Sequence, residues 1–291
     1  MTTRFGNTRC GNGAGRFVRV DGVPLHVVTE GRGPVVVLSA GLAMAWFDWD
    51  EVAALLVARG RTVVRFDRPG HGLSGPATAP ATAAGEAHRI AGLLDALGLT
   101  DPVTVVGHSI AGFHAEAFAR LHPERTAALV LVDSSVEEAP RTLLPAALRT
   151  AAARALGRAV TAAGLPAALG PGARRATVRA SRTGGGDPAA RDLVRRCYRT
   201  GRVWRGALLE NAGYPDTAAE VLALRGTHPL TAPATVLAAH DGSGGRRALR
   251  WPARQADLAD RLGARFELVE PAGHLVMLDR PDQVARAVLH A

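Results

Sequence analysis

One short stretch, residues 103–112, constrains the fold of this chain more than any other. It reads Val-Thr-Val-Val-Gly-His-Ser-Ile-Ala-Gly, so a β-branched apolar run leads into a serine, Ser109, set among small residues. A helical pattern follows from Phe113 and is stopped by Pro123. Strand, sharp turn and helix are the context in which a Gly-x-Ser-x-Gly-like motif presents a serine hydroxyl at the edge of a sheet.

The small residues of this motif have a physical reason. We expect Ser109 to have a strained backbone conformation, with neighbouring backbones too close for larger side chains at Gly107 and Ala111. The usual last glycine of the motif is Ala111 here, and Gly112 follows it.

Apolar runs alternate with helical patterns along much of the chain. Besides the run that begins at Val103, we expect strands at 16–20, 25–29, 35–39, 62–66, 128–132, 235–239 and 265–269. Helices are expected at 50–59, at 86–97, after Ser109, near 254–262 and after Pro281. This alternation predicts an α/β fold with a mostly parallel, twisted sheet of about eight strands, flanked by helices.

The alternation stops at residues 137–227. This segment is rich in alanine, arginine and leucine, is interrupted by proline and glycine, and contains no convincing β run. We predict that it is a helical cap, inserted after the sixth strand and lying over the open end of the sheet. The core would then comprise residues 16–136 and 228–291, and the polar, glycine-rich residues 1–15 would be a disordered leader.

Length and composition fit one large domain with an insertion. The chain has 291 residues, no apolar run long enough to cross a bilayer, and no secretory signal at its start. The two cysteines, Cys10 and Cys197, match neither a metal-ligand spacing nor a disulfide framework. We therefore expect a cytoplasmic protein that needs no metal and no other cofactor, and does not bind a membrane.

Positive charge is concentrated in the expected cap. The net charge is +9, and residues 137–227 contain 15 arginines and seven acidic residues. This pattern is typical of a solvated helical surface, but it would also attract a small anionic substrate or one bound to an acidic carrier protein. Without interleaved aromatic residues it does not indicate a nucleic-acid partner. The sequence leaves open whether the chain is a monomer or a homodimer.

A serine hydroxyl needs a general base within hydrogen-bond reach to become a nucleophile. The best candidate is His274, in a glycine-containing loop after the strand at 265–269. His71, His108 and His240 also lie near strand ends. His71 belongs to a turn, and His108 directly precedes Ser109, so its side chain should point away from the nucleophile.

Two aspartates are candidates for the acid that orients the histidine. Asp241 follows the strand at 235–239 and precedes a Gly-Ser-Gly-Gly loop, the expected topological position. Asp133 ends the strand after the serine-bearing helix, where it could also be a turn residue. Because a triad is defined by geometry, either strand end could present the carboxylate. We favour Asp241 and keep Asp133 as the alternative.

Backbone N–H groups should stabilise the oxyanion of a tetrahedral intermediate. The expected donors are Ile110, at the start of the helix, and Leu42, in the loop after the strand at 35–39. A substrate pocket could be lined by Gly41, Met44, Trp46 and His108. The aromatic residues downstream of Met44 could equally belong to the core.

Together, four segments resemble the α/β-hydrolase fold family over about residues 16–136 and 231–291. They are Ser-Ala-Gly-Leu at 39–42, Phe-Asp-Arg-Pro-Gly-His-Gly-Leu-Ser at 66–74, Val-Gly-His-Ser-Ile-Ala-Gly at 106–112 and Ala-Gly-His-Leu at 272–275. The resemblance implies Ser109 as nucleophile, His274 as base, an acid at the Asp241 or less often the Asp133 strand end, and a variable cap that shapes the pocket. Two departures are Ala40, where many members carry histidine before the oxyanion loop, and His240, which replaces a glycine before the acid.

The resemblance favours a serine hydrolase that cleaves a carboxylic ester, thioester or lactone through an acyl-enzyme on Ser109. Dehalogenase-like and epoxide-hydrolase-like members carry aspartate at the nucleophile position, so Ser109 argues against both. The same triad also occurs with lyase, perhydrolase and C–C hydrolase chemistry. A third alternative is a non-catalytic member that only binds a ligand.

Overall fold

The computed structural model describes residues 15–246 and 248–291, so most of the expected disordered leader at 1–15 lies outside the described residues. One sheet of eight strands runs through the molecule in the order β1-β2-β4-β3-β5-β6-β7-β8. β1 and β2 are antiparallel to their neighbours, and the remaining pairs are parallel. The strands are β1 (Arg16–Val20), β2 (Val23–Glu30), β3 (Val35–Ser39), β4 (Thr62–Phe66), β5 (Val103–His108), β6 (Thr126–Val132), β7 (Ala234–Ala239) and β8 (Arg265–Val269).

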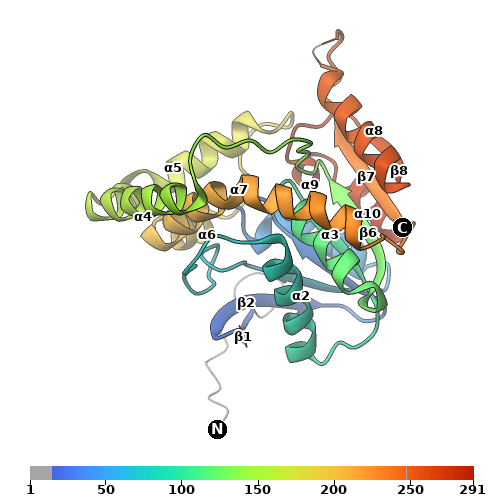
Figure 1. The fold of residues 1–291 in the computed structure, drawn as a ribbon, viewed down its shortest axis with the longest axis horizontal. Coiled ribbons are helices and arrows are strands. Elements are labelled where there is room, and N and C mark those ends of the chain that lie inside the picture. Colours follow the sequence, from blue (N-terminus) through green and yellow to red (C-terminus); the bar gives the residue numbers. More distant parts are fainter. Residues whose placement is uncertain (1–14, 247) are drawn as a thin grey trace.

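Helices cover both faces of this sheet (Figure 1). They are α1 (Asp50–Val57), α2 (Ala83–Leu97), α3 (Ala111–Leu121), α4 (Ala146–Ala162), α5 (Leu165–Ala180), α6 (Arg191–Tyr198), α7 (Gly201–Thr227), α8 (Arg250–Leu262), α9 (Val276–Asp279) and α10 (Pro281–Leu289), with short 3-10 helices η1 (Trp46–Trp49) and η2 (Pro123–Arg125). The predicted α/β class with a mostly parallel, eight-stranded sheet is confirmed.

Alternating side chains of the central strands build two separate cores. Val105 packs with α2, α3 and α8 on one face, whereas its neighbour Val106 packs with α1 and α10 on the other. Leu131 and Val132 alternate in the same way on β6. Strands buried on both faces explain why the central runs are continuously apolar.

The segment between β6 and β7 contains the helices α4 to α7, which extend to one side of the sheet in Figure 1. The second half of α7 is not detached from the core, because Ala218 and Val221 are buried with side chains of α2 and α3. The division into core and cap therefore stays a prediction, with α7 contributing to both. Within the described residues, no helix combines the length and apolarity needed to span a membrane.

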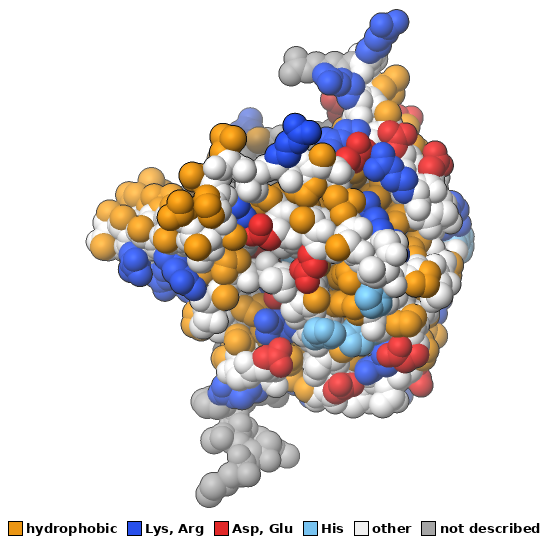
Figure 2. Space-filling view, in the orientation of Figure 1, with side chains coloured by type: hydrophobic (Ala, Val, Ile, Leu, Met, Phe, Trp, Pro, Cys, Tyr) orange, Lys and Arg blue, Asp and Glu red, His pale blue; other side chains and the backbone are white. Residues whose placement is uncertain are grey.

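Exposed apolar side chains gather on the part of the surface formed by α4 and α5 (Figure 2). Leu148 and Leu156 on α4 and Leu169 on α5 are each more than half exposed. Arginine side chains are spread over several parts of the visible face and do not form one continuous field (Figure 2).

Candidate active site

Ser109 lies at the carboxyl end of β5, in the turn that leads into α3. Its φ is +53°, in the left-handed region that non-glycine residues adopt at an energetic cost. The turn is close-packed: a Cβ at Gly107 would lie 2.3 Å from the Ala111 carbonyl oxygen. The expected strain and the need for a small residue at position 107 are therefore present in the structure.

Ser109 and His274 are within hydrogen-bond distance, although 165 residues separate them in the chain. Ser109 Oγ lies 3.1 Å from His274 Nε2. On the other side of the ring, His274 Nδ1 lies 2.5 Å from Asp133 Oδ2. Because a carboxylate can only accept, Nδ1–H is the donor and Nε2 is left free to accept the serine proton.

Sheet register explains why Asp133 is beside Ser109. His108 and Val132 are partners at the ends of the neighbouring strands β5 and β6, so Ser109 and Asp133 each follow that pair by one residue. Asp133 also has a positive φ, +42°, which bends the chain at the end of the strand.

The Asp133 carboxylate is buried and held by further donors. Its Oδ1 accepts hydrogen bonds from the Ala239 backbone N–H at 2.9 Å and from the Trp251 indole N–H at 2.7 Å. These contacts fix the carboxylate with Oδ2 toward His274. Trp251, on α8, has no local motif in the sequence and was not among the predicted site residues.

The structure places Asp133, and not Asp241, against the His274 ring, so the preference for Asp241 is wrong. Asp241 is exposed, and its Oδ1 accepts hydrogen bonds from the backbone N–H and hydroxyl of Ser243. These two bonds hold the pKa of the Asp241 carboxyl below its usual value. The loop after β7 thus turns back on itself, and the Asp133 strand end supplies the carboxylate instead.

The His108 side chain contacts the loop that carries His274. Its side chain is buried, and its Nε2–H donates to the His274 carbonyl oxygen at 2.9 Å. The ring centroids of the two histidines are 4.7 Å apart. Burial, and then the neighbouring His274, lower the pKa of His108 well below its usual value, so that ring stays neutral.

The expected oxyanion loop, which contains Gly41 and Leu42, lies beside Ser109. A Cβ at Gly41 would lie 3.2 Å from Ser109 Cβ and 2.7 Å from His108 Nδ1, so only a glycine fits against the motif. Leu42 lines the cavity in front of Ser109, and Ile110 lies at the amino-terminal end of α3. Their role as oxyanion donors stays a prediction.

A cavity of about 540 Å³ opens onto Ser109 and His274. Its walls are largely apolar and come from the oxyanion loop and from α5, α6 and α7. The lining residues include Met44, Arg174, Tyr198, Trp204, Leu208 and Asn211. Met44 and His108 line this cavity, as predicted, whereas Gly41 is not among its lining residues and packs against His108 and Ser109 instead.

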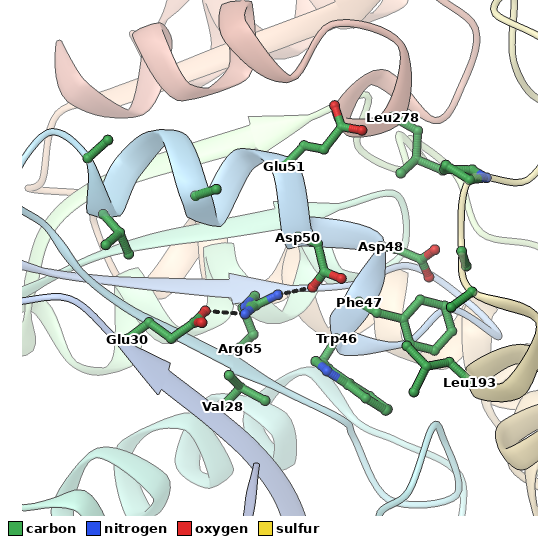
Figure 3. A pocket seen from close by; sticks show the side chains of 16 residues that line it. Val28, Glu30, Trp46, Phe47, Asp48, Asp50, Glu51, Arg65, Leu193 and Leu278 are labelled. Atoms are coloured by element: carbon green, nitrogen blue, oxygen red, sulfur yellow. Dashed lines mark hydrogen bonds and ion pairs between the residues drawn. The ribbon is translucent and has the colours of Figure 1, made fainter. Parts of the chain in front are cut away.

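Trp46 does not line that cavity, which corrects its predicted role in the substrate pocket. It lies in a second cavity of about 690 Å³, beside Val28 and Phe47 (Figure 3). The Trp46 ring packs edge-on against His26, and its backbone N–H donates to Asp67. These contacts hold Trp46 at the second cavity.

The second cavity contains neither Ser109 nor His274 among its lining residues. Arg65 crosses its floor and is paired with Glu30 and Asp50, which come from β2 and the start of α1 (Figure 3). The cavity is therefore separate from the serine and histidine described above.

Comparison with known proteins agrees with this architecture. A sequence model described as the alpha/beta hydrolase family matches residues 35–287. An epoxide hydrolase 3 of Siraitia grosvenorii is 31% identical over 126 residues, covering 43% of this chain and 39% of that protein. A 2-hydroxy-6-oxononadienedioate/2-hydroxy-6-oxononatrienedioate hydrolase 1 of Dechloromonas aromatica is 36% identical over 112 residues, covering 38% and 36%. The matched part is thus well under half the length of these curated relatives.

Among solved structures, wild-type Cfl2 from Burkholderia cenocepacia superposes with a TM-score of 0.75 at 24% identity, covering 99% of each chain. That likeness supports the fold. Because the family match extends over most of the sequence and the structural likeness over nearly all of it, this chain belongs to the alpha/beta hydrolase family.

Proposed function

We propose that this protein is a serine hydrolase that cleaves a carboxylic ester, thioester or lactone through an acyl-enzyme on Ser109. The observation that carries the proposal is the continuous contact from Ser109 Oγ through the His274 ring to Asp133. This arrangement of hydroxyl, imidazole and carboxylate is what nucleophilic catalysis by serine requires.

In the first half of the reaction His274 Nε2 takes the proton from Ser109 Oγ as that oxygen attacks the substrate carbonyl carbon. The carbonyl oxygen becomes an oxyanion, which the Leu42 and Ile110 N–H groups stabilise. When the tetrahedral intermediate collapses, the alcohol or thiol leaves with the proton from His274, and the acyl group remains on Ser109.

In the second half His274 takes a proton from water as the water oxygen attacks the acyl carbon. Collapse of the second tetrahedral intermediate releases the carboxylic acid and returns the proton to Ser109 Oγ. The Asp133 carboxylate stabilises the imidazolium form of His274 in both halves.

The side chain at the nucleophile position bears on the choice between family members. Epoxide-hydrolase-like members carry aspartate there, and this chain carries Ser109. Attack of Ser109 Oγ on an epoxide carbon would leave a serine ether, which has no carbonyl carbon for water to attack in the second step. The likeness to an epoxide hydrolase in sequence therefore supports the shared fold and not that reaction.

The cavity in front of Ser109 favours a neutral, apolar acyl group. Arg174 is the one arginine among the described residues that line it, and its guanidinium is paired with Asp48 and Asp187. The positive charge of Arg174 is neutralised by these two carboxylates, so it is not available to bind an anionic substrate. The remaining walls, such as Leu208 and Trp204, suit an acyl chain.

C–C bond hydrolysis is the second candidate, because one relative at 36% identity is named a hydrolase of 2-hydroxy-6-oxononadienedioate. Such hydrolases use a comparable serine triad. A dienedioate carries two carboxylates, and the paired state of Arg174 makes this substrate the weaker candidate.

A panel of p-nitrophenyl esters, thioesters and lactones tests the proposal, with wild type and Ser109→Ala measured in parallel. We expect hydrolysis by wild type, with a preference for neutral acyl groups, and a loss of about 10⁴-fold or more in Ser109→Ala. A fluorophosphonate should label Ser109 in wild type. Full esterase activity in Ser109→Ala would contradict the proposal.

A further inference from the structure

The loop that contains Leu42 is held in place by side chains from other parts of the chain. It leaves β3 at Ser39 and includes Ala43, whose φ of +57° is unfavourable for a residue with a Cβ. A strained turn keeps its shape only where its surroundings hold it. The partners of its backbone polar groups therefore decide where the Leu42 N–H points.

Tyr198, at the end of α6, holds the middle of the loop. Its hydroxyl donates a hydrogen bond to the Ala43 carbonyl oxygen at 2.7 Å, and its side chain is buried. Arg174, on α5, donates to the same hydroxyl oxygen at 3.2 Å. The tyrosine is thus fixed on both sides, between the oxyanion loop and the helices after β6.

The end of the loop is held through the same arginine. The Ala45 backbone N–H donates to Asp48 Oδ2 at 2.9 Å, and Arg174 forms a buried ion pair with that carboxylate. Arg174 therefore connects two anchors of the loop, Tyr198 and Asp48.

The beginning of the loop is held by Arg68, which is itself paired with Glu210 on α7. Arg68 donates to the carbonyl oxygens of Ala40 and Gly41, the latter at 3.1 Å. The other side of its guanidinium pairs with both oxygens of Glu210 at 2.8 and 3.0 Å. Arg68 and Glu210 are each about 4% exposed, so water competes little for this pair.

We propose that Tyr198 is a positioning residue for the oxyanion hole, so that the helices between β6 and β7 contribute to turnover as well as to the shape of the pocket. This inference rests on the proposed function of Ser109. Tyr198 acts through Ala43: without its hydroxyl the strained turn loses its central anchor, and the Leu42 N–H is no longer held toward the oxyanion. Arg68 secures the same loop from its other end.

The test compares Tyr198→Phe with Tyr214→Phe. These are the two tyrosines of the chain, and Tyr214 packs against Phe113, outside the Ser109 cavity. Rates are divided by the concentration of active sites titrated with a fluorophosphonate, so that a smaller folded fraction does not count as lost catalysis. KM and inhibition by phenylboronic acid, which forms a tetrahedral adduct on a reactive serine, are measured with the same preparations.

We expect Tyr198→Phe to lower kcat per titrated site about 10-fold, because a displaced donor loses part of the roughly 10²–10³-fold effect of one oxyanion contact. KM should change less than about 2-fold, boronate affinity should fall with kcat, and Tyr214→Phe should match wild type. Arg68→Lys should also lower kcat per site, because an ammonium group has fewer donors than the four acceptors that Arg68 contacts, the carbonyl oxygens of Ala40 and Gly41 and both oxygens of Glu210.

Equal kcat per site in Tyr198→Phe and Tyr214→Phe would overturn the inference, as would a loss that appears only in KM. The proposed function has a separate control in this experiment. If wild type hydrolyses no ester and its Ser109 is not labelled, the proposed function fails. If wild type is active and the two tyrosine variants are alike, only the role of Tyr198 fails.

Discussion

At the scale of single residues, two aspartates separated by 108 positions differ in what surrounds them. Asp133 is buried, and both of its carboxylate oxygens accept hydrogen bonds. Asp241 is exposed and accepts hydrogen bonds from Ser243, two residues further along its own loop. A buried carboxylate with one oxygen against an imidazole can fix the tautomer of that ring. An exposed one, screened by water, has little influence on it.

Substitution of each aspartate by asparagine tests this assignment. Asp133→Asn should lower kcat by about 10⁴-fold, because an amide cannot hold the Nδ1–H tautomer of His274. Asp241→Asn is the matched control and should leave kcat within about 2-fold. Initial rates on the best ester of the panel are the measurement. A large loss in Asp241→Asn with little effect in Asp133→Asn would restore the assignment that the sequence favoured.

At the scale of elements, the strand β5, its turn and the helix α3 are packed too closely for added atoms. A Cβ at Gly107 would also lie 2.8 Å from the Ala115 Cβ on α3. Helix and strand are thus in contact at the base of the turn that presents Ser109.

Gly107→Ala should therefore destabilise the protein by about 1–3 kcal/mol, as overpacking of a core does, and should lower activity by displacing Ser109. The control is Gly172→Ala on α5, where, apart from the neighbouring residues and backbone of the same helix, no described atom lies within 4 Å of an added Cβ. That change should be neutral or stabilise by up to about 1 kcal/mol. Urea unfolding midpoints of both variants provide the comparison, and a Gly107→Ala midpoint at or above that of wild type would refute the packing argument.

Local patterns predicted the elements well because their causes are local. The apolar run of β5 and the turn at Ser109 are encoded within ten residues, and the predicted strand 35–39 matches β3. Trp46 shows the limit: an apolar residue near the oxyanion loop could face either of two cavities, and its contact with His26 decides which.

Contacts between segments that are far apart in the chain could not be predicted from the sequence. The Trp251 indole meets Asp133 across 118 residues, and Arg68 meets Glu210 across 142. Neither pair has a spacing that a local pattern could reveal, although Arg68 lies in the quoted segment 66–74. The choice between Asp133 and Asp241 failed for the same reason, because it depends on the path of the loop after β7.

At the scale of the whole molecule, burial of titratable groups makes stability depend on pH. His114, on α3, is fully buried, and neither ring nitrogen has a hydrogen-bond partner among the described residues. Burial, and then the positive charge of Arg68, lower the pKa of His114 to about 3 from its usual 6.5. The folded state therefore binds this proton far less readily than the unfolded state does.

The sign of the effect follows from that difference. Below about pH 6.5 the unfolded chain binds a proton that the folded chain excludes, so the free energy of unfolding falls as pH decreases toward 3. From pH 7 to pH 5, His114 alone should remove about 2 kcal/mol. In His114→Leu the loss over this interval should be smaller by that amount, whereas the exposed control His290→Leu should behave as wild type. Equal losses in all three proteins by urea unfolding would contradict the prediction.

Intact-mass spectrometry of the protein, quenched during turnover of its best ester, tests the acyl-enzyme on Ser109 most directly. We expect a transient mass increase equal to the acyl group, located by peptide mapping on Ser109 and absent in Ser109→Ala. Turnover without such an adduct, with activity retained in Ser109→Ala, would contradict this expectation.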